Sequence, residues 1–223
     1  MLALRKHISP GWWLVAPFFL LVACLYLGPI LNILWLSLSD PEPGLQNYSK
    51  LVESDTLARI MWTTIRICVI TTGFAVILGY SIAYAMVHAY RREQSFMLTF
   101  LLVSFWISIL VRTFSWLMLL GRKGPINEGF EAIGLISEPV AFMRNELGVL
   151  IGMVHYMIPY AVLPLLVNMQ TLDQRVMSAS RNLGASASQT FFRIYLPMTR
   201  PGIVASALLV FILSLGFYVT PAV

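Results

Sequence analysis

Charged residues are scarce in this sequence. Asp, Glu, Lys and Arg together make up 11% of its 223 residues, whereas about a quarter is usual for a soluble domain. Hydrophobic residues make up 58%, and the mean hydropathy is +0.78. With the long uncharged runs described below, this composition excludes a soluble enzyme and a disordered tail. It indicates a chain whose main solvent is lipid.

Cysteine is also rare, and the positive charge is spread out. Cys24 and Cys68 both lie in apolar runs, so we expect them to be buried as small hydrophobic side chains rather than to form a disulfide or a metal site. The net charge is +5, but the Lys and Arg residues are scattered along the chain. Because they form no basic patch, we expect no nucleic acid partner.

Motifs for catalysis are missing as well. The sequence has no phosphate-cradling G-x-x-x-x-G-K-[ST], so ATP and Mg would have to be bound by a separate ATPase subunit. No Asp or Glu lies inside an apolar run, which argues against an intramembrane protease and a proton-relay transporter. We expect no catalytic residue, cofactor or metal site in this chain.

Five apolar segments are long enough to cross a bilayer, which takes about 20 helical residues. They are residues 12–38, 62–87, 96–120, 147–167 and 203–219. The first is too long for a signal peptide and lacks a cleavage site, so we interpret it as a retained anchor. No strand-like alternation is present. The sequence predicts an all-α membrane protein, a polytopic helical bundle, with a sixth span expected beyond Val223.

The distribution of charge predicts the orientation. With the amino terminus inside, eight basic and two acidic residues lie on the cytoplasmic side, and five basic and eight acidic residues lie in the outer loops. This asymmetry agrees with the positive-inside rule, so we expect a multi-pass protein of the bacterial inner membrane with a cytoplasmic amino terminus. The cytoplasmic basic residues are Arg5, Lys6, Arg91, Arg92, Arg175, Arg181, Arg193 and Arg200.

The chain divides into two parts in this reading. Residues 1–60 hold the cytoplasmic amino terminus, the anchor helix and an outer loop, and residues 61–223 hold the transmembrane core with a cytoplasmic loop at 168–202. That loop is too polar for a span and too regular for a linker. Two capping boxes predict two short helices in it, one starting at Thr171 with Gln174 and one at Ser186 with Gln189.

The first of these helices is amphipathic and the second is aromatic. Gly184 is the expected stop of the first helix, and Leu196-Pro197 is the expected end of the second. The apolar positions of the first helix recur at spacings of four, three and four residues, and the second carries three aromatic residues. These positions are Leu172, Val176, Ala179 and Leu183, followed by Phe191, Phe192 and Tyr195.

The run SASRNLGASASQTFFRIYLP, residues 178–197, resembles the cytoplasmic signature of bacterial ABC-importer permeases. That signature is an E-A-A triplet, then a Gly, nine further residues and I-x-L-P. Here the triplet is Ser178-Ala179-Ser180, the glycine is Gly184, and the spacing agrees throughout. Further runs at 47–48, 110–116, 151–160 and 214–222 are similar to the spermidine/putrescine branch of these permeases.

The resemblance implies a type I importer. In that family two permease subunits form the pore, two ATPase subunits bind ATP and Mg below them, and a periplasmic substrate-binding protein delivers the solute. The resemblance implies that the glycine turn docks on the ATPase. The coupling residues it implies are Arg175, Ser178, Ala179, Arg181, Gly184 and Ala185. The acidic first residue of the triplet is Ser178 here, so a charged contact at that place is weaker or supplied by Arg175 and Arg181.

A polar face is expected along the third span. Ser104, Ser108, Arg112 and Ser115 fall on one side of a continuous helix, and a polar stripe in lipid must face protein or water. Arg66 in the second span and His155 in the fourth reach a similar depth, and Pro159 leaves the carbonyl of His155 without its helical donor. The candidate translocation residues are Arg66, Ser104, Ser108, Arg112, His155, Tyr156 and Phe217.

The substrate and mechanism stay open at this point. The resemblance favours a polyamine, but the candidate cavity holds two arginines and no acid, which suits an anionic or zwitterionic solute better. An opine, a phosphonate, ferric iron or an amino-acid-like compound is therefore the alternative cargo. An ATP-independent carrier or channel is the alternative class, although the inverted repeats typical of carriers are not found.

Overall fold

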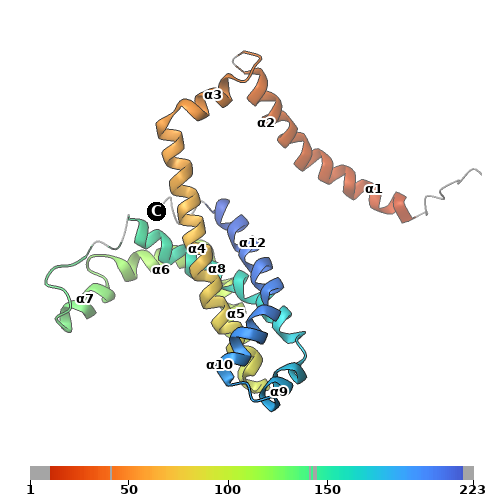
Figure 1. The fold of residues 1–223 in the computed structure, drawn as a ribbon. Helices are drawn as coiled ribbons and strands as arrows, with labels where there is room; N and C mark the ends of the chain where they lie inside the picture. The colour runs from red at the N-terminus through yellow and green to blue at the C-terminus, as the bar shows by residue number, and fades with distance from the viewer. Residues whose placement is uncertain (1–10, 41, 141, 143–144, 218–223) are drawn as a thin grey trace, which may run out of the picture. The chain divides into compact units, whose positions relative to one another are not determined.

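The computed structural model describes residues 11–40, 42–140, 142 and 145–217, and these are helical with connecting turns and no strand (Figure 1). The helices, of which η1 and η2 are π-helices, are α1 Gly11–Val22, η1 Ala23–Leu27, α2 Gly28–Ser39, α3 Gln46–Glu53, α4 Asp55–His88, α5 Arg91–Trp106, α6 Ile109–Leu120, α7 Pro125–Ala132, α8 Glu146–Gln170, α9 Gln174–Asn182, α10 Ala187–Thr190, η2 Phe191–Tyr195, α11 Leu196–Met198 and α12 Arg200–Leu215. The predicted all-α membrane fold is confirmed.

The chain forms two compact units, residues 1–61 and 62–223. In the first, the helical stretch Val15–Ser39 is long and apolar enough to span a membrane, and its side chains are largely exposed. Cys24 is exposed there, so the prediction that it is buried is wrong, whereas Cys68 in the second unit is buried. The predicted cytoplasmic residues Arg5 and Lys6 lie outside the described residues.

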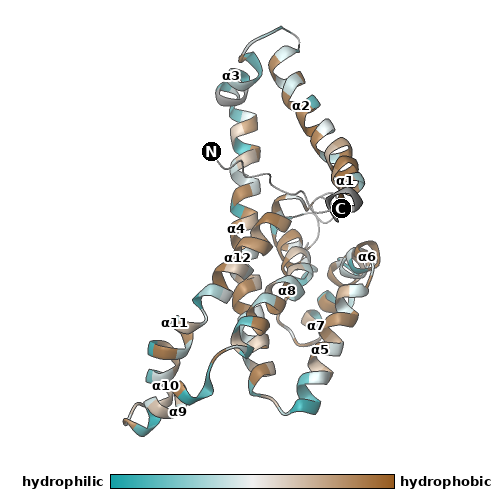
Figure 2. Cartoon of the chain, turned by 90° about the vertical axis from the view of Figure 1, so that its right-hand side faces the viewer, coloured by the Kyte–Doolittle hydropathy of each residue, from teal (hydrophilic) through white to brown (hydrophobic). Residues whose placement is uncertain are grey.

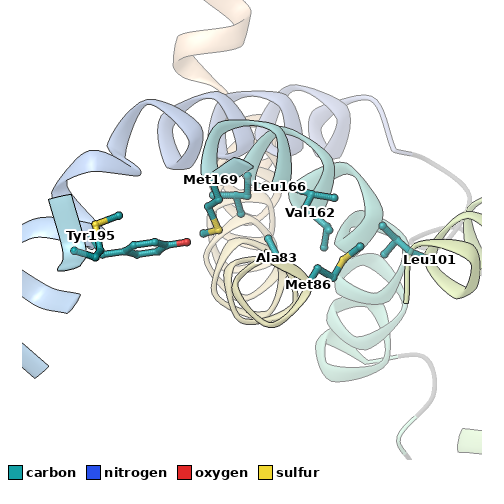
Figure 3. Packing of buried hydrophobic residues seen from close by; sticks show 9 residues of the cluster. Ala83, Met86, Leu101, Val162, Leu166, Met169 and Tyr195 are labelled. Carbon is teal, nitrogen blue, oxygen red and sulfur yellow. The ribbon is translucent and has the colours of Figure 1, made fainter. Parts of the chain in front are cut away.

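Helix α8 is the centre of the second unit. A Cβ atom added to Gly79 of α4 would lie 2.7 Å from the Cβ of Ala161 in α8, so the two helices touch through their backbones at this point. On another side of α8, the hydroxyl of Ser206 in α12 donates to the carbonyl of Ala161 over 3.0 Å. Figure 3 shows Val162 and Leu166 of α8 beside Ala83 and Met86 of α4. Small residues thus set how closely α4 approaches α8.

The second and fourth predicted spans are confirmed as single helices, α4 and α8. The third is not, because the chain bends by 95° between α5 and the stretch Ile109–Ala132. The residues at the break, Ile107 and Ser108, have ψ angles of 130° and 137°, outside the helical region. The prediction that Ser104, Ser108, Arg112 and Ser115 share one helical face is therefore wrong, since apolar composition does not report whether a backbone turns.

The fifth predicted span is shorter than expected. Helix α12 covers only Arg200–Leu215 and meets the preceding helical stretch, Ala187–Met198, at a bend of 58°. The end of the predicted span, residues 218–219, lies outside the described residues. Among the described residues, three helices are long and apolar enough to cross a membrane, or up to five if each bent pair is one span.

The loop predicted to be cytoplasmic is built partly as expected. Gly184 has a φ angle of +87° and ends α9, and Ser186 with Gln189 forms a capping box at the start of α10. The other box is wrong: Thr171 belongs to the carboxy-terminal end of α8, where its hydroxyl donates to the carbonyl of Asn168 over 2.7 Å. Asp173 caps α9 instead, accepting from the backbone N–H of Arg175 over 2.9 Å.

Leu196-Pro197 does not end the second helix. Pro197 is the second residue of α11, which continues directly from η2, and the chain stays helical to Met198. Because α8 runs to Gln170 and α12 begins at Arg200, the segment between the long helices is 171–199. Figure 2 shows hydrophilic residues gathered over α9, α10 and the beginning of α5, whereas α12 is mainly hydrophobic.

The contact between α4 and α8 makes a sharp prediction. Gly79→Ala would force a methyl group against Ala161, and we expect it to destabilise the protein by about 1–3 kcal/mol. Gly73→Ala is the matched control on the same helix, because a Cβ there meets nothing within 4 Å and alanine favours the helix by about 1 kcal/mol. Thermal unfolding of the purified protein in detergent should show opposite shifts for the two variants. Equal shifts would contradict the close contact.

Candidate functional site

Arg112 fills the break between α5 and α6. Its guanidinium donates to the carbonyl of Ser104 and, over 3.3 Å, to that of Ile107. Both carbonyls belong to the end of α5, where the last carbonyl groups of a helix have no helical partner. Only 6% of the Arg112 surface is exposed. The arginine that the sequence assigned to a translocation pathway therefore satisfies the free end of a broken helix.

An aromatic group surrounds the same arginine. Its guanidinium lies 5.1 Å from the ring centre of Tyr156, a cation–π geometry. The Tyr156 ring in turn lies 4.6 Å from Phe217, and the hydroxyls of Tyr156 and Tyr160 are 3.3 Å apart. Phe105 of α5 meets the ring of Tyr160 at 5.2 Å. Rings from α5, α8 and the end of α12 thus converge around one buried charge.

His155 faces a different set of residues. The indole N–H of Trp116 donates to Nδ1 of His155 over 3.1 Å, which joins α6 to α8. His155 also lines a groove of about 370 Å³ between α4, α5 and α8. Ser104 and Pro159 share this groove, and its other walls are apolar. The neighbouring Trp106 points elsewhere, being 84% exposed.

Arg66 is not part of either group. Its guanidinium forms a salt bridge with Glu146, at the beginning of α8, and both side chains are about half exposed. Ser108 contributes its carbonyl, which accepts from the backbone N–H of Arg112 over 3.1 Å. Of the predicted translocation residues, the structure brings together Ser104, Arg112, Tyr156 and Phe217, and His155 joins Ser104 in the groove between α4, α5 and α8. Their role in transport stays a prediction.

The predicted coupling residues form an exposed surface. Arg175, Ser178, Ala179, Arg181 and Gly184 are exposed and Ala185 is half-buried, and Leu183 beside them is 89% exposed. Met177 and Ser180, on the other side of α9, are buried. Helix α9 therefore packs on the protein through one face and leaves Val176, Ala179 and Leu183 exposed. No charged partner of Arg175 or Arg181 is seen among the described residues.

Two buried polar contacts were missed by reading the sequence. The hydroxyls of Ser180 and Thr190 are 2.9 Å apart and tie α9 to α10. In α7 the amide of the fully buried Asn127 donates to the carbonyls of Gly121 and Val140 and accepts from the N–H of Val140, each over 3.0 Å. Neither contact has a local sequence signal. Ser180 and Thr190 are ten positions apart, and the contacts of Asn127 depend on the path of the chain to Val140.

Comparison with known proteins places the chain in a family. Residues 75–223 match the family described as binding-protein-dependent transport system inner membrane component. The chain belongs to this family. Together with the apolar helices, membership makes the chain a multi-pass protein of the inner membrane.

Relatives in this family are transport permeases. The spermidine/putrescine transport system permease protein PotB of Haemophilus influenzae is 34% identical over 176 residues, which are 78% of this chain and 61% of PotB. The same protein of Escherichia coli K12 is 34% identical over 79% of this chain and 64% of that relative. The chain thus spans a little over three fifths of the length of these curated relatives.

A solved structure shares the fold. The crystal structure of a bacterial ABC transporter involved in the import of the acidic polysaccharide alginate superimposes with a TM-score of 0.71 at 18% sequence identity, covering 89% of this chain and 71% of that chain. The chain therefore shares the fold of that transporter chain.

The geometry of Arg112 predicts a structural cost for its loss. Arg112→Met would leave the carbonyls of Ser104 and Ile107 without this donor, and we expect the purified protein to lose about 1–3 kcal/mol of stability in total. Arg66→Met is the matched control, because the exposed pair with Glu146 is expected to contribute at most about 1 kcal/mol. Thermal unfolding in detergent compares the two variants. An unchanged midpoint for Arg112→Met would show that the guanidinium does not cap α5.

Proposed function

We propose that this chain is a permease subunit of an ATP-driven importer and forms half of the translocation pathway for a polyamine of the spermidine/putrescine kind. The observation that carries the proposal is the loop between α8 and α12, where Gly184 stands at the glycine position of the family signature and turns the chain with a left-handed backbone. The similarity to PotB over 78% of the chain supports the same assignment and suggests the substrate class.

Arg66 and Arg112 are not expected to repel a polycation, because both are engaged by other groups. Arg66 is neutralised by Glu146, and Arg112 is occupied by helix carbonyls and the face of Tyr156. Neither is a free positive charge in a cavity. Aromatic rings attract ammonium groups, so Tyr160, Phe105 and Phe217 offer the chemistry that a polyamine needs. An anionic or zwitterionic solute would need a free positive charge to bind, and neither Arg66 nor Arg112 offers one.

The partners follow from the same reading. A second permease subunit would complete the pore, a periplasmic binding protein would deliver the solute, and two ATPase subunits would hold ATP and Mg, leaving this chain without an enzymatic step. The exposed face with Val176, Ala179 and Leu183 is the surface we assign to the ATPase, since an apolar helix face beside Arg175 and Arg181 suits a groove on a soluble partner.

The orientation belongs to the proposal. The ring of His88, at the end of α4, lies 5.7 Å from Tyr195 in η2, so the α4–α5 turn with Arg91 and Arg92 is on the same side as the coupling loop. Basic residues favour the cytoplasm. A reporter fused at Arg92 or Ser186 should therefore be cytoplasmic, and one fused near Asn127 should be periplasmic. A periplasmic signal at Ser186 would reverse the orientation.

The decisive experiment is transport by the reconstituted complex. Proteoliposomes holding the chain with its second permease and ATPase subunits should take up radiolabelled putrescine or spermidine only when the binding protein and ATP are present. The same vesicles tested with an amino acid, an opine, a phosphonate and ferric iron identify the alternative cargo. Uptake without ATP would support a carrier or channel instead.

The turn at Gly184 gives the coupling test within that preparation. Gly184→Val should abolish stimulated ATP hydrolysis and uptake, because a β-branched residue at φ +87° costs about 1–2 kcal/mol or more. Gly184→Asn is the control, since asparagine tolerates this backbone conformation, and a Cβ here meets nothing within 4 Å. Normal coupling with valine would show that the loop is a passive connector.

A further inference from the structure

The cytoplasmic end of α4 carries a row of rings at helical spacing. Tyr80, Tyr84 and His88 are four residues apart and therefore lie on one side of the helix. The rings of Tyr84 and His88 are 4.2 Å apart, and Nδ1 of His88 lies 2.9 Å from the carbonyl of Tyr84.

The π-helix η2 carries a matching pair. Phe191 and Tyr195 are also four residues apart, with ring centres at 5.9 Å and nearly parallel planes. Tyr84 meets both rings edge to face, Phe191 at 5.6 Å and Tyr195 at 5.3 Å. Tyr80 meets Phe191 at 6.3 Å. These are the separations and angles at which aromatic pairs attract each other beyond their burial.

We propose that these five residues, Tyr80, Tyr84, His88, Phe191 and Tyr195, form an aromatic clamp that transmits movement of the coupling loop to α4. The proposal rests on the proposed function, because it needs an ATPase that moves the loop. The clamp residues are positioning residues: they touch neither nucleotide nor transported solute. Figure 3 shows the Tyr195 side chain extending toward Met169 of α8 and the α4 residue Ala83.

The clamp is connected on the side of the coupling helix. The buried hydroxyl pair Ser180–Thr190 joins α9 to the residue directly before Phe191. A displacement of α9 by a docked partner therefore moves Thr190, and with it the first ring of η2. Closely packed groups pass on such a displacement because they have little free volume to absorb it.

The clamp is also connected on the side of α12. The hydroxyl of Tyr80 lies 3.2 Å from Oγ1 of the fully buried Thr199, which itself bonds the carbonyl of Leu196 over 2.8 Å. Thr199 sits at the 58° bend between η2–α11 and α12. Tyr195 is only 3% exposed. The loop, the bend before α12 and the end of α4 thus share one packed set of side chains.

Substitution of Tyr84 tests the clamp in the reconstituted complex. Tyr84→Leu keeps an apolar side chain but removes the ring that meets both Phe191 and Tyr195, and we expect the stimulation of ATP hydrolysis by binding protein with putrescine to fall at least about fivefold, within the range typical of coupling between sites. The basal ATPase rate should not change. Tyr84→Phe retains the ring and should restore stimulation. Phe74→Leu, an exposed ring on the same helix, is the matched control and should have no effect.

A double-mutant cycle separates the clamp from a general loss of stability. If Tyr84 and Tyr195 act through their contact, Tyr84→Leu with Tyr195→Leu should be no worse than the poorer single variant, because the second change removes an interaction already lost. Multiplying effects would overturn the clamp. Basal and stimulated rates that fall in proportion would overturn it too, since that pattern marks damaged folding.

Assembly and the parent activity are checked separately. Co-purification with the ATPase is measured first, and if Tyr84→Leu does not assemble, Phe191→Leu, which keeps the contact of Tyr84 with Tyr195, takes its place with the same expected loss of stimulation. If complexes with Tyr84→Leu or Phe191→Leu are stimulated by the binding protein as strongly as the wild type, the clamp is refuted and the proposed function stands. A wild-type complex that binding protein never stimulates would refute the proposed function, and the clamp with it.

Discussion

The satisfaction of backbone hydrogen bonds in lipid is the constraint on which the rest of this structure depends. A bilayer offers no water to a free carbonyl, so a helix can break at membrane depth only where protein groups replace the lost bonds. The break between α5 and α6 interrupts a stretch that is apolar enough to be one span. Arg112 supplies the donors there, and its charge is in turn covered by Tyr156. Arg112, which the sequence suggests as a transport residue, therefore stabilises the break between α5 and α6.

Close contact between helices follows a second rule of the same solvent. Because lipid competes for apolar surface as well as protein does, helices associate where small residues let their backbones touch. Gly79 against Ala161 and the hydroxyl of Ser206 on a carbonyl of α8 are contacts of this kind. They hold α4 and α12 on α8, and so fix the ends of α8 and α12 between which the segment 171–199 runs.

The loop between α8 and α12 combines a left-handed turn with an exposed apolar surface. Gly184 ends α9 with a backbone that few residues adopt, while Leu183 beside it is exposed. Buried hydroxyls and rings on the inner side connect this surface to α4 and α12. In the function proposed above, a partner binds the outside of the loop and the inside follows its movement.

The sequence by itself determined the solvent, the fold class, the spans that became α4 and α8, and the turn at Gly184 with its capping box at Ser186. These depend on composition, on periodicity within one helix or on the backbone demands of a few neighbouring residues, all of which are local. It could not determine that the third span breaks or that Arg66 pairs with Glu146. Such features are settled by the position of residues far apart in the chain: a carbonyl of α5 is satisfied only because α6 turns back, and Tyr84 meets Tyr195 only because α4 and η2 are packed side by side. Tertiary structure decided them because each of these contacts has no energy until both partners are in place.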